Sequence, residues 1–230
     1  MATARADAAA LRRVQVAILA KAPLPGLAKT RLIPALGARG AARLQRRLTR
    51  EAVAKALAAE LGPVTLWCAP DARQRFFRAL QRTTGVACLV QPGGDLGERM
   101  HCAFRLHCST GPLLLIGTDC PPMTAAHLRA AACALLEGDD AVFVPAEDGG
   151  YVLVGLREPQ RALFDAMAWS TPSVMAATRA RARAAGLALR ELPALWDLDL
   201  PADLDRLSAA QAARLGVARW PAAAALRGNA

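Results

Sequence analysis

The sequence predicts an α/β protein with a mostly parallel mixed sheet. Short apolar runs that end in glycine or proline alternate with longer amphipathic stretches of helical period along most of the chain. Strands that alternate with helices are typical of folds in which helices cover a parallel sheet. The 230 residues are 54% hydrophobic, enough for one sizeable core, and no repeat or linker interrupts the pattern. We therefore expect a single domain over residues 1–230.

The centre of the predicted sheet is the stretch PLLLIGTDCPP, residues 112–122. Its apolar run at 113–117 is too short for a helix and ends at a glycine, so it predicts a buried strand. Asp119 follows directly, and Pro121 and Pro122 prevent the chain from continuing as strand or helix. Ligands of open parallel sheets bind beyond the carboxyl ends of the strands. We interpret Asp119 as a ligand of a divalent metal ion that holds a nucleotide diphosphate.

The remaining elements follow the same alternation of periods. Apolar or β-branched runs predict further strands at 14–20, 64–69, 86–91, 140–145, 152–156 and 187–192. Amphipathic runs predict helices at about 38–61, 72–81, 101–109, 124–137 and 171–186, with a last helix after 204. Thr171 and Pro172 form a typical helix start, and Gly138 and Gly186 are typical stops. We expect a loose tail over 217–230.

The loop after the first strand, KAPLPGLAKTRL at 21–32, is predicted to bind phosphate. Glycine lets backbone amides approach a phosphate, and nearby cations neutralise it. Only three of the 29 basic residues of the chain are lysines, and two of them lie in this loop. The turn-forming and basic residues concerned are Lys21, Pro25, Gly26, Lys29 and Arg31. The loop is not a P-loop, because Ala28 precedes the lysine where that motif has glycine. A solvated basic turn is the alternative.

A metal ion at Asp119 needs further oxygen ligands, since magnesium usually takes one or two carboxylates together with substrate phosphates. The candidates are Asp148 in the loop at 146–151, and Asp197 or Asp199 in the stretch WDLDLP. Asp199 resembles Asp119 most, because both precede a turn that contains proline. Each acid also has a structural alternative. An acid at a strand end often caps a helix, and Asp199 could be the N-cap of a helix that begins near Pro201.

Two glycine-containing loops, AEDGGY at 146–151 and PGGDLGERM at 92–100, are predicted to contact substrate. The residues concerned are Gly149, Gly150 and Tyr151 in the first loop, and Gly94, Asp95 and Arg99 in the second. Paired glycines indicate positive φ angles or a close backbone approach. We interpret the first loop as a sugar or acceptor contact and the second as the frame of a base or ribose. A plain turn is the alternative for both.

Composition restricts the partners and the compartment. The net charge of +10 favours acidic partners, but the arginines fall mostly on predicted helices, as on solvated faces. Aromatic residues make up 4% of the chain, too few for a base-stacking surface, so we expect no nucleic acid partner. The six cysteines form no CxxC pair and are expected to be reduced core thiols. Without an apolar run of eighteen residues or a secretion signal, the chain is expected to be cytoplasmic and to bind no membrane.

Six motifs in order, KAPLPGLAKTRL, GGDLGERM, GTDCPP, AEDGGYVLVGL, WST and DLDLPADL, resemble a bacterial family of GT-A-fold glycosyltransferases. This family was formerly a domain of unknown function, and some members are associated with arsenosugar biosynthesis. The resemblance covers about residues 14–207. It implies a three-layer α/β/α nucleotide-diphospho-sugar transferase fold, a nucleotide at the first loop, and a metal ion on Asp119 with Asp199 as second ligand. More distantly the chain resembles nucleotidyltransferases, whose first loop is richer in glycine and carries an arginine before its lysine.

The preferred hypothesis is a glycosyltransferase dependent on Mg²⁺ or Mn²⁺ that moves a sugar from a nucleoside diphosphate to a small acceptor. Lys29 would assist the leaving phosphate, together with the other cations of its loop. Asp148 would act as a base on the acceptor or would orient it. One alternative is a nucleotidyltransferase that uses a nucleoside triphosphate and releases pyrophosphate. An alternative of another class is a non-catalytic protein that binds nucleotides or nucleic acid through its positive charge.

Overall fold

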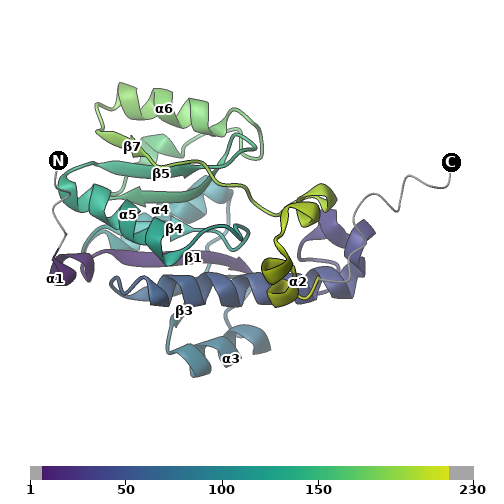
Figure 1. The fold of residues 1–230 in the computed structure, drawn as a ribbon. Helices are drawn as coiled ribbons and strands as arrows, with labels where there is room; N and C mark the ends of the chain where they lie inside the picture. The colour runs from purple at the N-terminus through teal and green to yellow at the C-terminus, as the bar shows by residue number, and fades with distance from the viewer. Residues whose placement is uncertain (1–6, 218–230) are drawn as a thin grey trace.

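Seven strands of residues 7–217, the part of the chain that the computed structural model describes, form one mixed sheet (Figure 1). The strands are β1 (Gln15–Lys21), β2 (Val64–Ala69), β3 (Ala87–Val90), β4 (Leu113–Ile116), β5 (Ala141–Pro145), β6 (Tyr151–Leu156) and β7 (Leu189–Glu191). Their order is β3-β2-β1-β4-β6-β5-β7. All neighbours are parallel except β6, which is antiparallel to both β4 and β5. The predicted α/β fold with a mostly parallel mixed sheet is confirmed.

Helices cover both faces of this sheet. The α-helices are α1 (Ala8–Leu11), α2 (Ile33–Ala58), α3 (Arg75–Thr84), α4 (Leu96–His107), α5 (Ala125–Glu137), α6 (Val174–Ala184) and α7 (Ala209–Leu215). Three short 3₁₀ helices are η1 (Thr30–Leu32), η2 (Arg161–Leu163) and η3 (Pro201–Arg206). Buried residues of α2, α3 and α5 form one core cluster, and those of α4 and α6 form another on the opposite face. Helices α2 and α5 run along the front of the sheet in Figure 1. The molecule is therefore a three-layer α/β/α structure.

The central strands are buried on both faces. In β4, Leu114 and Ile116 belong to the cluster under α2, α3 and α5, whereas Leu113 and Leu115 belong to the cluster under α4 and α6. All four side chains are at most 4% exposed. A strand that is covered on both sides reads as a continuous apolar run, which is why the sequence indicates this strand so clearly.

A third core cluster packs the C-terminal part of the described chain against η1 and α2. Leu198, Leu204 and Leu215 pack against Leu32, Leu44 and Leu48 from η1 and α2. Figure 1 shows the C-terminal segment lying across one end of α2. This packing brings the segment around residue 198 beside the loop that follows β1.

Several element boundaries differ from those predicted. The first long helix begins at Ile33, and Gly37 interrupts it at a φ of +67°. Ser173, not Thr171, is the N-cap of α6. The last predicted helix is divided into η3 and α7. Helices α1 and η2 were not predicted, because four and three residues are too few for a periodic pattern. The tail expected over 217–230 lies, beyond residue 217, outside the described residues.

Between residues 7 and 217, no helix is both long enough and apolar enough to cross a membrane.

Candidate functional site

A cavity of about 620 Å³ opens at the carboxyl ends of β1 and β4. The loop after β1, the turn after β4 and the segment at 197–199 all contribute to its wall. Eight of the predicted site residues line it: Lys21, Lys29, Arg31, Arg99, Asp119, Asp148, Tyr151 and Asp199. Its volume is in the range of ordinary small-molecule sites.

The topology of the sheet explains why these distant segments meet. Strands β1, β4, β5 and β7 all end at the same edge, because each is parallel to the others through the chain of pairings. The antiparallel β6 begins at that edge, so the β5–β6 hairpin with Asp148 lies there too. The segment after β7 then carries Asp197 and Asp199 to the same place. Loops at the carboxyl ends of strands are where open α/β sheets bind ligands.

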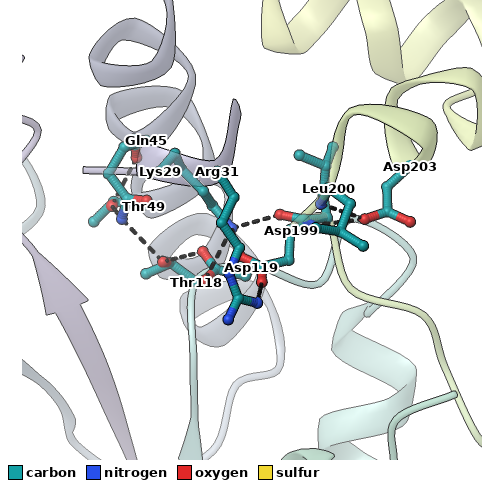
Figure 2. Close-up of polar contacts among 10 residues, drawn as sticks. Lys29, Arg31, Gln45, Thr49, Thr118, Asp119, Asp199, Leu200 and Asp203 are labelled. Atoms are coloured by element: carbon teal, nitrogen blue, oxygen red, sulfur yellow. Dashed lines mark hydrogen bonds and ion pairs between the residues drawn. The ribbon is translucent and has the colours of Figure 1, made fainter. Parts of the chain in front are cut away.

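The ammonium group of Lys29 lies between two carboxylates (Figure 2). Its Nζ is 3.0 Å from Asp119 Oδ2 and 3.9 Å from Asp199 Oδ1. It also donates a hydrogen bond to the carbonyl oxygen of Leu198. The lysine side chain is 3% exposed, whereas the two carboxylates are about 40% exposed, at 43% and 38%. The two acids predicted to hold a metal ion therefore both face the ammonium group of Lys29.

The backbone of Lys29 is unusual for a lysine. Its φ of +51° and ψ of +47° lie in the left-handed region, immediately before η1. A residue with a Cβ atom is strained there by about 1–2 kcal/mol. This conformation accompanies a side chain that turns inward to the two acids. Strained backbone of this kind is concentrated at functional sites.

Neither Asp119 nor Asp199 caps a helix. Asp203 accepts the backbone N–H groups of Asp199 and Leu200 at the start of η3, at 2.9 and 2.6 Å. The carboxylate of Asp199 is bound instead by Arg31 Nη1. Asp119 does not cap the helix that follows it, because the N-cap of α5 is Thr124. The capping alternatives for both acids are therefore wrong, and their side chains face the cavity.

Asp197 is a further acid of the cavity wall. Burial and the neighbouring Asp148 carboxylate raise the pKa of Asp197 to about 6. Two carboxylates that face the same space disfavour each other's ionisation, and this effect is typical of active sites. From the sequence, Asp197 is a candidate ligand only as an alternative to Asp199. The structure places both acids on the same wall, because the intervening Leu198 points into the core.

Six predicted site residues do not line the cavity: Pro25, Gly26, Gly94, Asp95, Gly149 and Gly150. Asp95 is the N-cap of α4, where it forms a reciprocal capping box with Glu98. Gly149 has a φ of +93°, and a Cβ atom there would lie 2.1 Å from the Pro172 carbonyl oxygen. The close approach predicted from its sequence is thus an approach to the protein's own backbone.

Tyr151 reaches the cavity wall but is otherwise held by the core. Its ring packs edge-on against Phe143 and Trp169, with centroids 5.0 and 6.4 Å apart, and its hydroxyl contacts Met100 Sδ at 3.9 Å. Burial strongly raises the pKa of the Tyr151 hydroxyl. The ring therefore shapes the wall, and the hydroxyl stays protonated at neutral pH.

Gln45 and Thr118 also line the cavity, and neither is among the site residues predicted from the sequence. The signal for Gln45 is its place in the apolar stripe of α2, beside Leu44 and Leu48, where a polar side chain is out of pattern. Thr118 carries no comparable signal, because threonine is common at strand ends.

The carboxylates of Asp119 and Asp199 fit a magnesium or manganese site whose remaining ligands come from the substrate and water. Residues 7–217 contain no group of three or more His, Cys, Asp or Glu side chains arranged to hold a metal ion. Asp119 and Asp199 nevertheless converge on one cationic group, the ammonium of Lys29, which occupies the position between them in this structure. Magnesium is often bound by one or two carboxylates and completes its shell with phosphate oxygens and water.

Solved structures of nucleotide-processing transferases share this fold. A protein from Desulfovibrio desulfuricans G20, described as a candidate nucleotide-diphospho-sugar transferase, is 26% identical with a TM-score of 0.80, over 90% of this chain and 94% of that one. The inositol-1-phosphate CTP transferase from T. maritima is 11% identical with a TM-score of 0.55, over 93% of this chain and 98% of that one. The second likeness concerns the fold alone.

Among curated proteins, the phosphoenolpyruvate guanylyltransferase of Sphaerobacter thermophilus is 34% identical over 129 residues. The match covers 54% of this chain, and the chain spans about 60% of the length of that relative. A family model described as an uncharacterized protein conserved in bacteria matches residues 52–171, which include the central strand and Asp119. The chain belongs to this bacterial family, DUF2064.

Proposed function

We propose that the protein is a nucleotidyltransferase, which uses a nucleoside triphosphate and releases pyrophosphate. The observation that carries the proposal is the meeting of Asp119, Asp199 and Lys29 at the mouth of a cavity beyond the central strands. Carboxylates with cations from the first loop are what a site for a metal-bound phosphate chain requires. The 34% identity to a guanylyltransferase supports nucleotidyl transfer over the sugar transfer preferred from sequence.

The name of that relative also supports a small phosphorylated acid as the acceptor class. In such a reaction an oxygen of the acceptor phosphate attacks the α-phosphorus of the triphosphate. A new P–O bond forms, the bond between the α-phosphorus and the bridging oxygen breaks, and pyrophosphate leaves with the electron pair. A phosphate oxygen is already deprotonated at neutral pH, so this step needs no general base.

The residues of the cavity divide into two groups. Asp119 and Asp199 would hold Mg²⁺ or Mn²⁺, which supplies charge neutralisation of the phosphates and the leaving group when bound. Lys21, Lys29 and Arg31 bind phosphate oxygens. Arg99 is a fourth cation on the wall, and its buried Nε finds no hydrogen-bond partner among residues 7–217. We assign Arg99 to an anionic group of the nucleotide or acceptor.

Asp148 lies exposed on the wall beside Asp197. We assign it to orienting the acceptor, and to accepting a proton only where the acceptor is an alcohol. Gly149 and Gly150 belong to the β5–β6 hairpin that carries Asp148, and Gly94 precedes the N-cap of α4, the helix that carries Arg99.

Glycosyl transfer is the second candidate. The likeness to the Desulfovibrio desulfuricans protein, at a TM-score of 0.80, favours it through that protein's description. The same acids and cations would then hold the diphosphate of a nucleotide sugar, and the nucleoside diphosphate would be the leaving group.

Product analysis distinguishes the two candidates. The protein is incubated with Mg²⁺, each of the four ribonucleoside triphosphates and a panel of phosphorylated acids and sugar phosphates, including phosphoenolpyruvate. We expect pyrophosphate from one nucleotide and acceptor pair, and at least a hundredfold loss in Asp119→Asn. A parallel panel of nucleotide sugars is assayed for nucleoside diphosphate. Release of nucleoside diphosphate without pyrophosphate would establish the second candidate and reject the first.

A further inference from the structure

A chain of hydrogen bonds runs from the interior of α2 to the carboxylate of Asp119. Gln45 Nε2 donates to Thr118 Oγ1 at 3.0 Å, and Thr118 Oγ1 donates to Asp119 Oδ1 at 2.8 Å. Gln45 Nε2 also donates to Thr49 Oγ1 at 3.3 Å, and Thr49 Oγ1 donates to the Gln45 carbonyl oxygen at 2.9 Å. Figure 2 shows these side chains to the left of Asp119, on the side away from Asp199.

In this series of hydrogen bonds, the partner groups determine where each threonine hydroxyl proton points. The Thr49 hydroxyl points its proton at a backbone carbonyl, and the Thr118 hydroxyl points its proton at a carboxylate, neither of which can donate. Both hydroxyl oxygens are therefore acceptors for Gln45, which must present its NH₂ group to them. The amide of Gln45 thus orients the hydroxyl that binds Asp119 Oδ1.

The location of Gln45 argues against a purely space-filling role. The residue is 4% exposed and lies in the apolar stripe of α2 between Leu44 and Leu48. A polar side chain buried there stabilises the fold only if its groups are hydrogen-bonded, whereas leucine at the same position would bury without that cost. The amide nitrogen of Gln45 donates to the hydroxyls of Thr49 and Thr118, and the Thr118 hydroxyl in turn binds Asp119.

Helix α2 holds the Asp119 turn at a second point. Lys55 Nζ donates to the Pro121 carbonyl oxygen at 2.9 Å and lies 3.6 Å from Glu51 Oε2. Gln45 and Lys55 therefore bind the turn on either side of Asp119. Helix α2 thus holds the turn at two points.

We propose that Gln45 and Thr118 are positioning residues that hold Asp119 with Oδ1 inward and Oδ2 facing the cation site. The proposal rests on the proposed function, because it names what orients the metal ligand of that site. A carboxylate with one oxygen held by Thr118 presents the other in a single direction, toward Lys29 Nζ at 3.0 Å. Hydrogen bonds of this kind behind a metal ligand typically contribute 10–100-fold to metal affinity or activity.

The test measures binding of Mn²⁺ alone, from the electron paramagnetic resonance signal of the free ion. Thr118→Val removes the hydroxyl at nearly constant volume, Gln45→Met removes the amide, and Thr118→Ser keeps the hydroxyl. Thr178→Val is the matched control, because Thr178 is a buried threonine of α6 whose hydroxyl donates to a backbone carbonyl and does not line the cavity. Circular dichroism and thermal unfolding without metal establish that each variant is folded.

We expect the Mn²⁺ dissociation constant to rise about tenfold or more in Thr118→Val and Gln45→Met. It stays close to the wild-type value in Thr118→Ser and Thr178→Val. Wild-type affinity in Thr118→Val and Gln45→Met would overturn the proposal, and so would an equal loss in Thr118→Ser and Thr118→Val. Asp119→Asn separates this failure from failure of the proposed function. If Asp119→Asn alone loses Mn²⁺, the metal site stands without these positioning residues; if it binds Mn²⁺ like the wild type, both proposals fail.

A second readout needs no metal. In a crystal structure of Thr118→Val, the Asp119 carboxylate should rotate and the distance from Oδ2 to Lys29 Nζ should lengthen from 3.0 Å. An unchanged carboxylate would count against the proposal.

Discussion

The backbone amide of Leu198 donates a hydrogen bond of 2.8 Å to the carbonyl oxygen of Asp119. This bond joins the turn after β4 to the segment after β7, and it fixes Asp199 near Asp119 through the main chain. Leu198 is fully buried in the cluster under η1 and α2, which keeps the segment in place. The approach of the two carboxylates therefore does not depend on their attraction to Lys29 alone.

Lys29 is predicted to stabilise the fold as well as to bind phosphate. Its buried ammonium group contacts Asp119, Asp199 and the Leu198 carbonyl, so Lys29→Met leaves these acceptors without their shared donor. We expect the free energy of unfolding to fall by about 1–3 kcal/mol, measured by urea denaturation. Lys21→Met is the control, because Lys21 is an exposed lysine of the same loop and its loss should change stability by less than about 0.5 kcal/mol. Equal effects of the two substitutions would contradict the assigned contacts.

Asp95 is predicted to act on α4 rather than on a nucleotide. Its side chain accepts the Glu98 N–H at 2.9 Å as the helix N-cap. Asp95→Ala should lower the free energy of unfolding by about 1 kcal/mol, and Asp95→Asn should change it little, since asparagine also caps helices. Neither substitution should weaken nucleotide binding beyond its effect on stability. Loss of nucleotide affinity in the stable Asp95→Asn variant would instead support the role predicted from sequence.

His107 should make the protein less stable in mild acid. Trp67 Nε1, which can only donate, binds His107 Nε2 at 3.3 Å, so the ring proton is on Nδ1, facing Gln15 Oε1 at 3.0 Å. Burial lowers the pKa of His107 from its ordinary value of 6.5. The unfolded chain then takes up the proton first, and this contribution to stability is complete above about pH 6.5 and is lost as the pH falls toward the folded-state pKa.

Urea unfolding between pH 7.5 and 5 measures this effect. The stability of the wild type relative to His107→Gln should fall below about pH 6.5. Asp197, whose raised pKa acts in the opposite direction, is present in both proteins and cancels in this difference. Parallel pH profiles for the two proteins would mean that His107 does not contribute to this dependence.

The fold could be predicted from sequence because its central strands are continuous apolar runs. Leu113–Ile116 is covered by helices on both faces, and such a strand has no polar residue to confuse the pattern. The parallel edge at which Asp119 emerges follows from the alternation of strands and helices. That Asp119 and Asp199 lie near each other is implied by the resemblance between motifs. The cause of this proximity, the packing of Leu198 under α2, depends on tertiary structure that no local pattern encodes.

The glycine loops show where local signals were ambiguous. Gly149 does have a positive φ and a close backbone neighbour, but the neighbour is Pro172 and not a ligand. Sequence indicates that such a residue lacks space for a side chain, and it does not indicate what fills that space. Gln45 shows the opposite case, in which a functional position gives too weak a signal. The apolar residues of α2 predict the helix, and one polar residue among them does not change that prediction. The partner of Gln45, Thr118, lies on another element, far away in sequence.

Thermal unfolding with nucleotide and metal tests the central claim most directly, namely that Asp119 and Asp199 form a metal and nucleotide site with the first loop. The wild-type protein and the Asp119→Asn variant are heated with each nucleoside triphosphate, in the presence of Mn²⁺ or of a chelator. A ligand at a hundred times its dissociation constant stabilises the native state by about 2.7 kcal/mol, or about 5–10 °C for a chain of this size. We predict such a shift for one triphosphate with wild-type protein and Mn²⁺, and its loss with chelator or in Asp119→Asn. A shift of equal size in Asp119→Asn, or no shift with any triphosphate, would contradict the claim.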